Sequence, residues 1–408
     1  MTLTLLKMVH GGAALARLPN GQVALVKGGI PGEEVEAELK LRAGVLQGTV
    51  KAVLAPDPAR CDRSPHPGLD YSHMHYAKQL ELKHQVIHDA LLRSLGQEVA
   101  VPPLRASPEL WGYRHAVQPA VVGQALGYRL PESHEPVALY SDPVAHNSLN
   151  ALWQQWPGWN TPKGIRELAL RCNAAGTVLA CLIADRPARE YLSFAHRLLR
   201  VGITGVGYAA FDPRGRFRRG SERLAGVRTI VQRYGRFDIT VTTTSFAQPN
   251  PAAASLLYGE LEAWVDQVHT ALDLYAGSGV IAMHLAAKAQ RVVAWELDRG
   301  SVARGERDAE HLGLSNLTFV RADAKQVIIP PEIDLIAVNP PRAGLAKPVR
   351  EAIIASQAAR LIYVSCDVAT WARDVAHFVG AGFRLEKVQP YDFYPQTHHS
   401  ELLSLLCR

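Results

Sequence analysis

The sequence predicts an α/β protein whose C-terminal part is a doubly wound, mostly parallel sheet. From about residue 250 onward, helical and strand patterns alternate, and the strand at 270–277 ends in a glycine turn that opens into a helix. Residues 1–55, by contrast, alternate apolar and polar residues over short runs separated by turns. This second pattern indicates a small β-barrel ahead of the sheet.

The composition is that of an ordinary folded protein. Hydrophobic residues make up 48% of the 408 residues and charged residues 20%, which excludes a disordered or fibrous chain. The net charge of +6 favours a polyanionic partner. The five cysteines are few, odd in number and scattered, so we expect reduced thiols rather than disulfides.

Three parts are expected along the chain. Residues 1–55 would form the barrel, residues 56–240 a central α+β domain, and residues 241–408 the doubly wound domain. Residues 55–68 are rich in proline and charge, which is typical of a linker. Residues 77–96 carry apolar residues at helical spacing and end at a glycine, as helices often do.

The central part contains a predicted antiparallel hairpin, formed by residues 111–123 and 126–139. The final part then alternates helices and strands, which requires a mostly parallel sheet wound on both faces. Its expected helices are 251–265, 278–289 and 301–313, and its expected strands are 270–277, 291–298, 317–323, 333–340 and 361–365.

The glycine turn predicts a nucleotide-type cofactor. Gly277 and Gly279 lie where the first strand turns into its helix, so the backbone can approach a ligand closely. Glu296 ends the next strand, where a carboxylate can accept both ribose hydroxyls. These residues suit NAD as well as S-adenosyl-L-methionine (AdoMet). Asp323, which would face an adenine amino group, and the NPPR segment at 339–342 favour AdoMet.

The NPPR segment also argues against methylation of an amino group. In amino-methyltransferases an aromatic residue follows Asn-Pro-Pro and binds the base. Here Arg342 follows, so no ring is available for stacking.

Cys366 is the candidate nucleophile. It follows a strand at the carboxyl edge of the sheet, where ligands bind in such folds, and Ser365 and Asp367 flank it. A thiolate that adds to carbon six of uracil makes carbon five nucleophilic, so that carbon five can accept a methyl group. The thiol would need a lowered pKa, which sequence does not establish. We therefore expect methyl transfer to carbon five of a pyrimidine.

This reaction also needs a base that removes the proton from carbon five. Glu401 is the candidate, placed by a loop just before the final apolar strand. His398 and His399 compete for the role, and they could instead bind phosphate or orient the glutamate.

With these motifs, the chain resembles the RNA uracil-C5-methyltransferase family. The matching segments follow the family's order and include residues 245–250, 273–279, 294–298, 338–345, 361–374 and 393–403. The resemblance implies Cys366 as nucleophile and Glu401 as base, acting on a uridine flipped out of folded RNA. It also implies AdoMet contacts from Gln248, Tyr275, Glu296 and Asn339. Asn339 departs mildly from the family, which often has aspartate there.

The N-terminal part resembles the TRAM domain, an OB-like module of RNA-modifying enzymes, over residues 11–39. Relatives with this domain often hold a four-iron cluster through cysteines. Here only Cys61 remains, and the later cysteine position corresponds to Asp142. One thiol cannot hold such a cluster, so we expect none. Cys61, His66 and His73 leave a different metal open.

The TRAM-like part favours 23S ribosomal RNA as substrate, because bacterial transfer-RNA members of the family typically lack it. The alternatives are uridine 54 of transfer RNA, a cytosine-C5 methyltransferase, and a non-catalytic RNA-binding or chaperone protein on a methyltransferase scaffold. The N-terminus has no apolar signal region, and no apolar run reaches the roughly 18 residues of a membrane span. We expect a cytoplasmic monomer without a membrane anchor.

Overall fold

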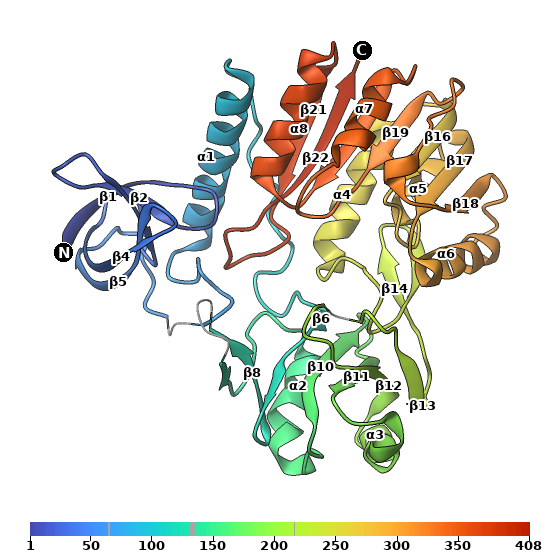
Figure 1. Ribbon diagram of the computed structural model, residues 1–408, viewed down its shortest axis with the longest axis horizontal. Helices are drawn as coiled ribbons and strands as arrows, with labels where there is room; N and C mark the ends of the chain where they lie inside the picture. The colour runs from blue at the N-terminus through green and yellow to red at the C-terminus, as the bar shows by residue number, and fades with distance from the viewer. Residues whose placement is uncertain (64–65, 131–134, 216) are drawn as a thin grey trace. The chain divides into compact units, whose positions relative to one another are not determined.

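The structure of the protein is a computed structural model (Figure 1). The residues that it describes are 1–63, 66–130, 135–215 and 217–408. The predicted linker and hairpin include residues 64–65 and 131–134, which lie outside the described residues.

The chain divides into two compact units. The first unit contains the segments Met1–Ser107, Gln267–Tyr275 and Asp323–Arg408. The second unit contains Pro108–Asp266 and Ala276–Ala322. Both units combine segments that are distant in sequence, so the three-part division predicted above stays a prediction.

The N-terminal strands of the first unit close a five-stranded barrel (Figure 1). In barrel order they are β1 (Thr2–Met8), β2 (Ala14–Arg17), β3 (Val23–Lys27), β5 (Val45–Ala55) and β4 (Glu34–Arg42). Alternate residues of these strands point inward and are buried, as the apolar–polar alternation requires. They include Leu3, Leu5, Ala16, Val26 and Val35. The closed barrel confirms the OB-like module expected here.

Helix α1 (Tyr76–Leu95) follows the barrel and confirms the helix predicted at 77–96. It ends at Gly96, whose φ of +67° is the left-handed conformation that glycine adopts without strain. Its buried face packs against α8 (Val368–Gly380). None of the helices within the described ranges has the length and apolar character that a membrane span needs.

The second unit contains an eight-stranded sheet. Its strands are β6 (Ala116–Val117), β7 (Ala120–Val122), β8 (Ala125–Arg129), β9 (Pro136–Ala138), β10 (Ile165–Cys172), β11 (Val178–Ala184), β12 (Ile203–Ala210) and β13 (Glu222–Gly226). They run in the order β13-β12-β11-β10-β7-β8-β9, and β6 also pairs with β10. The antiparallel pairing of β7 with β8 confirms the predicted hairpin.

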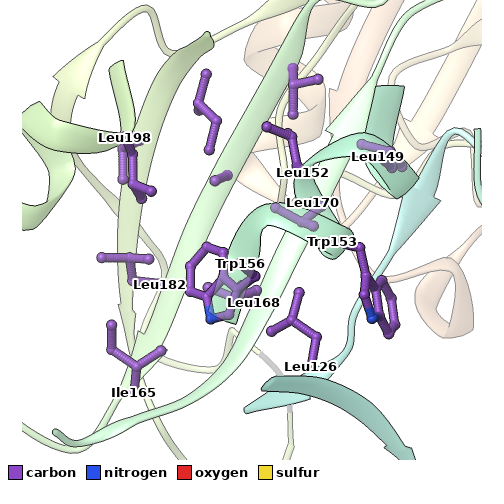
Figure 2. Close-up of a cluster of buried hydrophobic side chains, with 14 of the residues drawn as sticks. Leu126, Leu149, Leu152, Trp153, Trp156, Ile165, Leu168, Leu170, Leu182 and Leu198 are labelled. Carbon is purple, nitrogen blue, oxygen red and sulfur yellow. The ribbon is translucent and has the colours of Figure 1, made fainter. Parts of the chain in front are cut away.

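Two helices cover the core of this sheet, α2 (Asn147–Gln155) and α3 (Leu192–Arg200). Figure 2 shows Trp153 and Trp156 within a cluster of buried leucines. A separate hairpin, β14 (Ile230–Tyr234) and β15 (Phe237–Val241), precedes helix α4 (Pro251–Trp264).

The C-terminal sheet has seven strands in the order β18-β17-β16-β19-β20-β22-β21. The strands are β16 (Val268–Leu274), β17 (Ala289–Glu296), β18 (Leu317–Arg321), β19 (Leu335–Val338), β20 (Arg360–Ser365), β21 (Arg384–Tyr391) and β22 (Glu401–Cys407). The helices that alternate with them are α5 (Val280–Ala286), α6 (Arg299–His311), α7 (Lys347–Ala355) and α8. This arrangement confirms the predicted α/β fold.

The direction of the strands decides where functional side chains gather. β16, β19 and β20 are neighbouring parallel strands, so their carboxyl ends meet at one edge of the sheet. β22 runs antiparallel to β20, which brings its amino end to that same edge. The residues of β19 and β22 are almost all buried, as expected when a sheet is covered on both faces.

Candidate active site

Cys366 lies at the junction of β20 and α8, at the carboxyl edge of the sheet. The next residue, Asp367, caps α8 by accepting the N–H of Thr370 at 2.9 Å. The thiol is partly exposed and lines a cavity of about 120 Å³. Of the other cysteines, Cys172 and Cys181 are buried in the second unit.

The cavity wall is rich in nitrogen-bearing side chains from distant segments of the first unit. His10 comes from the loop between β1 and β2, and Lys83 comes from α1. Arg342 follows β19, and His398 and His399 precede β22. The guanidinium of Arg342 in this wall suits a ligand that carries negative charge.

The Cys366 thiol is not ionised in advance. Burial, followed by the charge of Glu401, raises its pKa to about 11, although Arg342 acts in the opposite direction. The lowered pKa that the sequence analysis required is therefore absent from the free protein. A positive charge brought by a ligand would favour the thiolate.

Glu401 lies across a β-ladder from Cys366. Ser365 pairs with Leu402 between antiparallel β20 and β22, so Cys366 and Glu401 occupy the next positions outward. The sequence analysis placed Glu401 in a loop, and this was wrong. It is the first residue of β22, because it pairs with Tyr391 of β21.

The carboxyl group of Glu401 is fully buried, and neither of its oxygens has a hydrogen-bond partner among the residues that the structure describes. Burial raises its pKa to about 8, with Arg342 opposing the shift. A general base works best when its pKa lies near the working pH, so this carboxyl is suited to accept a proton. Its neighbour Ser400 lines the cavity.

The two histidines before Glu401 have different partners. His398 donates its backbone N–H to Asp70 at 3.0 Å, and its ring Nδ1 also meets the Asp70 carboxylate. His399 presents Nε2 to the guanidinium of Arg342 at 3.4 Å. Burial, with His398 and Arg342 nearby, lowers the pKa of His399 to about 3. His399 is therefore neutral and acts as an acceptor for Arg342.

Side chains of α1 form hydrogen bonds with the loop that carries these histidines, residues 392–400. Gln79 donates to the Gln396 side chain at 2.8 Å and accepts the Gln396 N–H at 2.8 Å. Lys83 donates to Asp392 at 2.7 Å, and both side chains are fully buried. The loop is thus held by side chains more than 300 residues away in sequence.

Three predicted cofactor residues belong to the first unit. Tyr275 follows β16 with a φ of +62°, an uncommon conformation for a bulky residue and one that is frequent at functional sites. Its hydroxyl accepts a hydrogen bond from the Ala346 backbone. Asp323 accepts the N–H of Lys325 at 3.0 Å. Asn339 follows β19 and is partly exposed.

The other predicted cofactor residues belong to the second unit. Glu296 accepts the N–H of Gly277 at 2.9 Å and that of Asp298 at 2.7 Å, so both carboxylate oxygens are fixed in direction. Gly277 has a φ of +59°, and apart from Gly277 and its two chain neighbours no described residue has an atom within 4 Å of the point that a Cβ would occupy. That open space fits a ligand lying close to the backbone, so these residues suit AdoMet.

Gly279 and Gln248 have surroundings that packing explains. A Cβ on Gly279 would lie 2.5 Å from the ring of Phe319, so glycine is required by the neighbouring side chain. Gln248 is buried, and its backbone carbonyl accepts a hydrogen bond from the hydroxyl of Tyr234 at 2.7 Å.

Sequence reasoning missed the partners that lie in other segments. His10 forms an ion pair with Asp367, at 3.3 Å between His10 Nε2 and the carboxylate oxygen. Asp70 meets His398, and Lys83 meets Asp392. The one local signal was the pair Gly11 and Gly12 after His10, which predicts a tight turn but does not indicate which residues the turn contacts.

The residues present do not fit a four-iron cluster. Cys61 Sγ lies 3.2 Å from Nδ1 of His75, a histidine that the sequence analysis did not single out. Asp142 is buried and accepts the hydroxyl of Tyr128 at 2.7 Å and the N–H of Val144 at 3.1 Å. Across the described parts of the chain, no three His, Cys, Asp or Glu side chains are grouped to hold a metal ion. That the protein lacks a cluster stays a prediction.

Two family models match the C-terminal half. Residues 245–363 match the "Methyltransferase small domain", and residues 331–408 match "tRNA (Uracil-5-)-methyltransferase". Together with the sheet and the glycine turn, these matches define the class of protein as an AdoMet-dependent methyltransferase.

Relatives match the chain over nearly its whole length. An uncharacterised RNA methyltransferase from Thermosynechococcus vestitus is 30% identical over 97% of this chain and 95% of its own. The 23S rRNA (uracil(1939)-C(5))-methyltransferase RlmD from Pseudomonas entomophila is 30% identical over 98% of this chain and 92% of its own. The chain belongs to the RNA uracil-C5-methyltransferase family. This membership excludes the non-catalytic and cytosine-C5 alternatives.

A solved structure shares the fold. The tRNA (uracil-54, C5)-methyltransferase of Pyrococcus abyssi, in complex with S-adenosyl-L-homocysteine, superposes with a TM-score of 0.80 over all of both chains. The two sequences are 22% identical.

Proposed function

We propose that the protein methylates carbon five of a uridine in 23S ribosomal RNA, with Cys366 as nucleophile and Glu401 as base. One observation carries this proposal. Cys366 lines a cavity and lies across a β-ladder from a fully buried carboxyl that has no hydrogen-bond partner in the described parts of the chain. Burying an unpaired carboxyl costs folding free energy, and such groups cluster at functional sites.

The two residues would act in sequence. The Cys366 thiol gives its proton to solvent water, and its sulfur adds to carbon six of uracil, which makes carbon five nucleophilic. AdoMet, when bound, supplies the methyl group and a positive sulfonium charge. Ionised Glu401 then removes the proton from methylated carbon five. The electrons of that C–H bond restore the double bond between carbons five and six, and the sulfur leaves as thiolate.

We further propose which residues contact AdoMet. Glu296 would bind the ribose hydroxyls, because its two oxygens are already oriented by backbone N–H groups. Asp323 would meet the adenine amino group. The full set is Gln248, Tyr275, Gly277, Gly279, Glu296, Asp323 and Asn339.

The choice of ribosomal RNA has two supports. The relative RlmD, which matches nearly the whole chain, is a 23S rRNA enzyme. The N-terminal barrel is the module expected of that branch. Uridine 54 of transfer RNA is the second candidate, because the P. abyssi enzyme of that specificity has the same fold. We propose that the protein acts as a monomer in the cytoplasm, where its RNA substrate is made.

A methylation assay tests the substrate. The purified protein is incubated with methyl-labelled AdoMet and either 23S rRNA fragments or transfer-RNA transcripts, and nucleosides are identified by mass spectrometry. We expect 5-methyluridine in the ribosomal fragments and none with Cys366→Ala. Product in transfer RNA alone would support the second candidate, and product in neither RNA would contradict the proposal.

A further inference from the structure

The barrel contributes part of the wall of the Cys366 cavity. The loop between β1 and β2 lines this cavity with Val9, His10 and Gly11. An RNA-holding module that served only as a tether would not need to reach the nucleophile. The loop therefore has a place in the active site itself.

The seating of this loop is tight. Gly12 has a φ of +78°, and a Cβ at this position would lie 2.5 Å from the Asp70 carboxylate and 2.9 Å from His398. Only glycine fits such an approach, because it has no side chain to clash. The backbone of the loop thus packs directly against Asp70 and His398.

His10, which lies in this loop, contacts Asp367, the residue after Cys366. Its Nε2 lies 3.3 Å from the Asp367 carboxylate, which also caps α8. Their hydrogen bond raises the pKa of His10 above its ordinary value, although burial and Arg93 oppose the shift. Burial acts to raise the pKa of Asp367, but His10 and Thr370 hold it well below its usual range. Asp367 is therefore a fixed negative charge beside the thiol.

That negative charge opposes ionisation of the thiol. Glu401 and Asp367 both disfavour a thiolate at Cys366, whereas Arg342 favours it. Among the described residues, the other titratable groups on the cavity wall are Tyr71, Lys83, His398 and His399. A cation that binds Asp367 removes one of the two opposing charges.

We propose that protonated His10 is a positioning residue that neutralises Asp367 and thereby favours ionisation of the Cys366 thiol. The barrel thus completes the active site rather than only holding RNA. The inference rests on the proposed role of Cys366 as nucleophile. His10 exchanges no proton with the substrate and forms no covalent bond; it acts through Asp367 alone.

Alkylation of Cys366 by iodoacetamide tests the inference without RNA or AdoMet. The rate is followed on the full chain between about pH 6 and pH 10, and peptide mass spectrometry isolates the Cys366 peptide from the other cysteines. Because only thiolate reacts, the rate reports the thiolate fraction. The variants are His10→Gln, which is neutral, His10→Lys, which keeps a cation, and Asp367→Asn, which keeps a helix cap.

We expect wild type to react about threefold faster than His10→Gln at pH 6, which corresponds to a thiol pKa lower by about one unit, because roughly half of the gain in thiolate fraction is lost to lower thiolate nucleophilicity. The ratio should fall to one as pH rises through the pKa of His10, since neutral His10 no longer offsets Asp367. His10→Lys should keep the advantage to higher pH. In the Asp367→Asn background, His10→Gln should have no effect.

Equal rates for wild type and His10→Gln at pH 6 would overturn the inference, and so would a rate ratio that does not change with pH. A His10→Gln effect that persists in Asp367→Asn would also overturn it, because it would not act through Asp367. The proposed function fails on a different readout, since it requires a covalent adduct of Cys366 with RNA.

Discussion

The carboxyl group of Glu401 is buried away from water, and no donor of the described residues forms a hydrogen bond with it. Burial raises its pKa from the ordinary 4.5 to about 8, so the folded state binds the proton more tightly than the unfolded chain does. For such a group, its contribution to stability is complete below pH 4.5 and is lost as pH rises through about 8. Function and stability therefore oppose each other at this residue.

Glu401→Gln should stabilise the protein and abolish turnover. Above the unfolded pKa of 4.5, wild type loses about 1.4 kcal/mol of unfolding free energy for each pH unit, because the unfolded chain releases the Glu401 proton and the folded protein keeps it. The loss reaches about 3 kcal/mol at pH 7, and glutamine, which does not ionise, avoids it. The gain in unfolding free energy should vanish near pH 4 and level off above about pH 8. Urea unfolding at several pH values measures it. Glu386→Gln, at a half-exposed position, is the control and should change little at any pH.

The activity of the wild-type protein should also report the ionisation of Glu401. Ionised Glu401 and the Cys366 thiolate are the reactive forms, so kcat/KM should rise steeply with pH up to about 8, where Glu401 ionises, and less steeply above it, where only the thiol with its pKa of about 11 still titrates. A pH profile of methyl transfer at low substrate concentrations measures this. A profile that is flat between about pH 6 and pH 9 would contradict the assignment of the base.

At the scale of elements, the loop at residues 392–400 is the part of the site that depends most on distant support. Lys83 and Asp392 form its fully buried ion pair, and Tyr394 donates its N–H to the same carboxylate at 3.1 Å. Removing one member of a buried pair leaves the other charge without compensation, which is more damaging than losing an exposed pair. The order of the loop, and with it His398 and His399, should depend on α1.

Lys83→Met should destabilise the protein by about 3–5 kcal/mol, because it leaves Asp392 buried and unpaired. Urea unfolding at neutral pH measures the change. The control is Lys78→Met on the same helix, where the partner Glu81 is exposed, and it should cost less than about 1 kcal/mol. A similar cost for both variants would show that the buried pair does not hold the loop.

The whole molecule shows which parts of the site a sequence can predict. The glycine turn at Gly277 and the strand that ends just before Cys366 were predicted, because local patterns encode them. The position of Glu401 within β22 was not predicted, since it depends on pairing with β20 and β21. His10 reaches Asp367 across more than 350 residues of sequence, and no local pattern carries that information. The place of Cys366 at the edge of the sheet was thus predictable, whereas its electrostatic surroundings were not.

The central claim is that Cys366 attacks carbon six of uracil, and trapping with 5-fluorouridine RNA tests it most directly. Fluorine at carbon five cannot be removed as a proton, so the adduct formed after methyl transfer should persist. In the presence of AdoMet, wild type and the control Cys407→Ala should both give a denaturation-resistant complex with RNA, mapped to the Cys366 peptide. Cys366→Ala should give none. No complex with wild type, or a complex that persists in Cys366→Ala, would contradict the account.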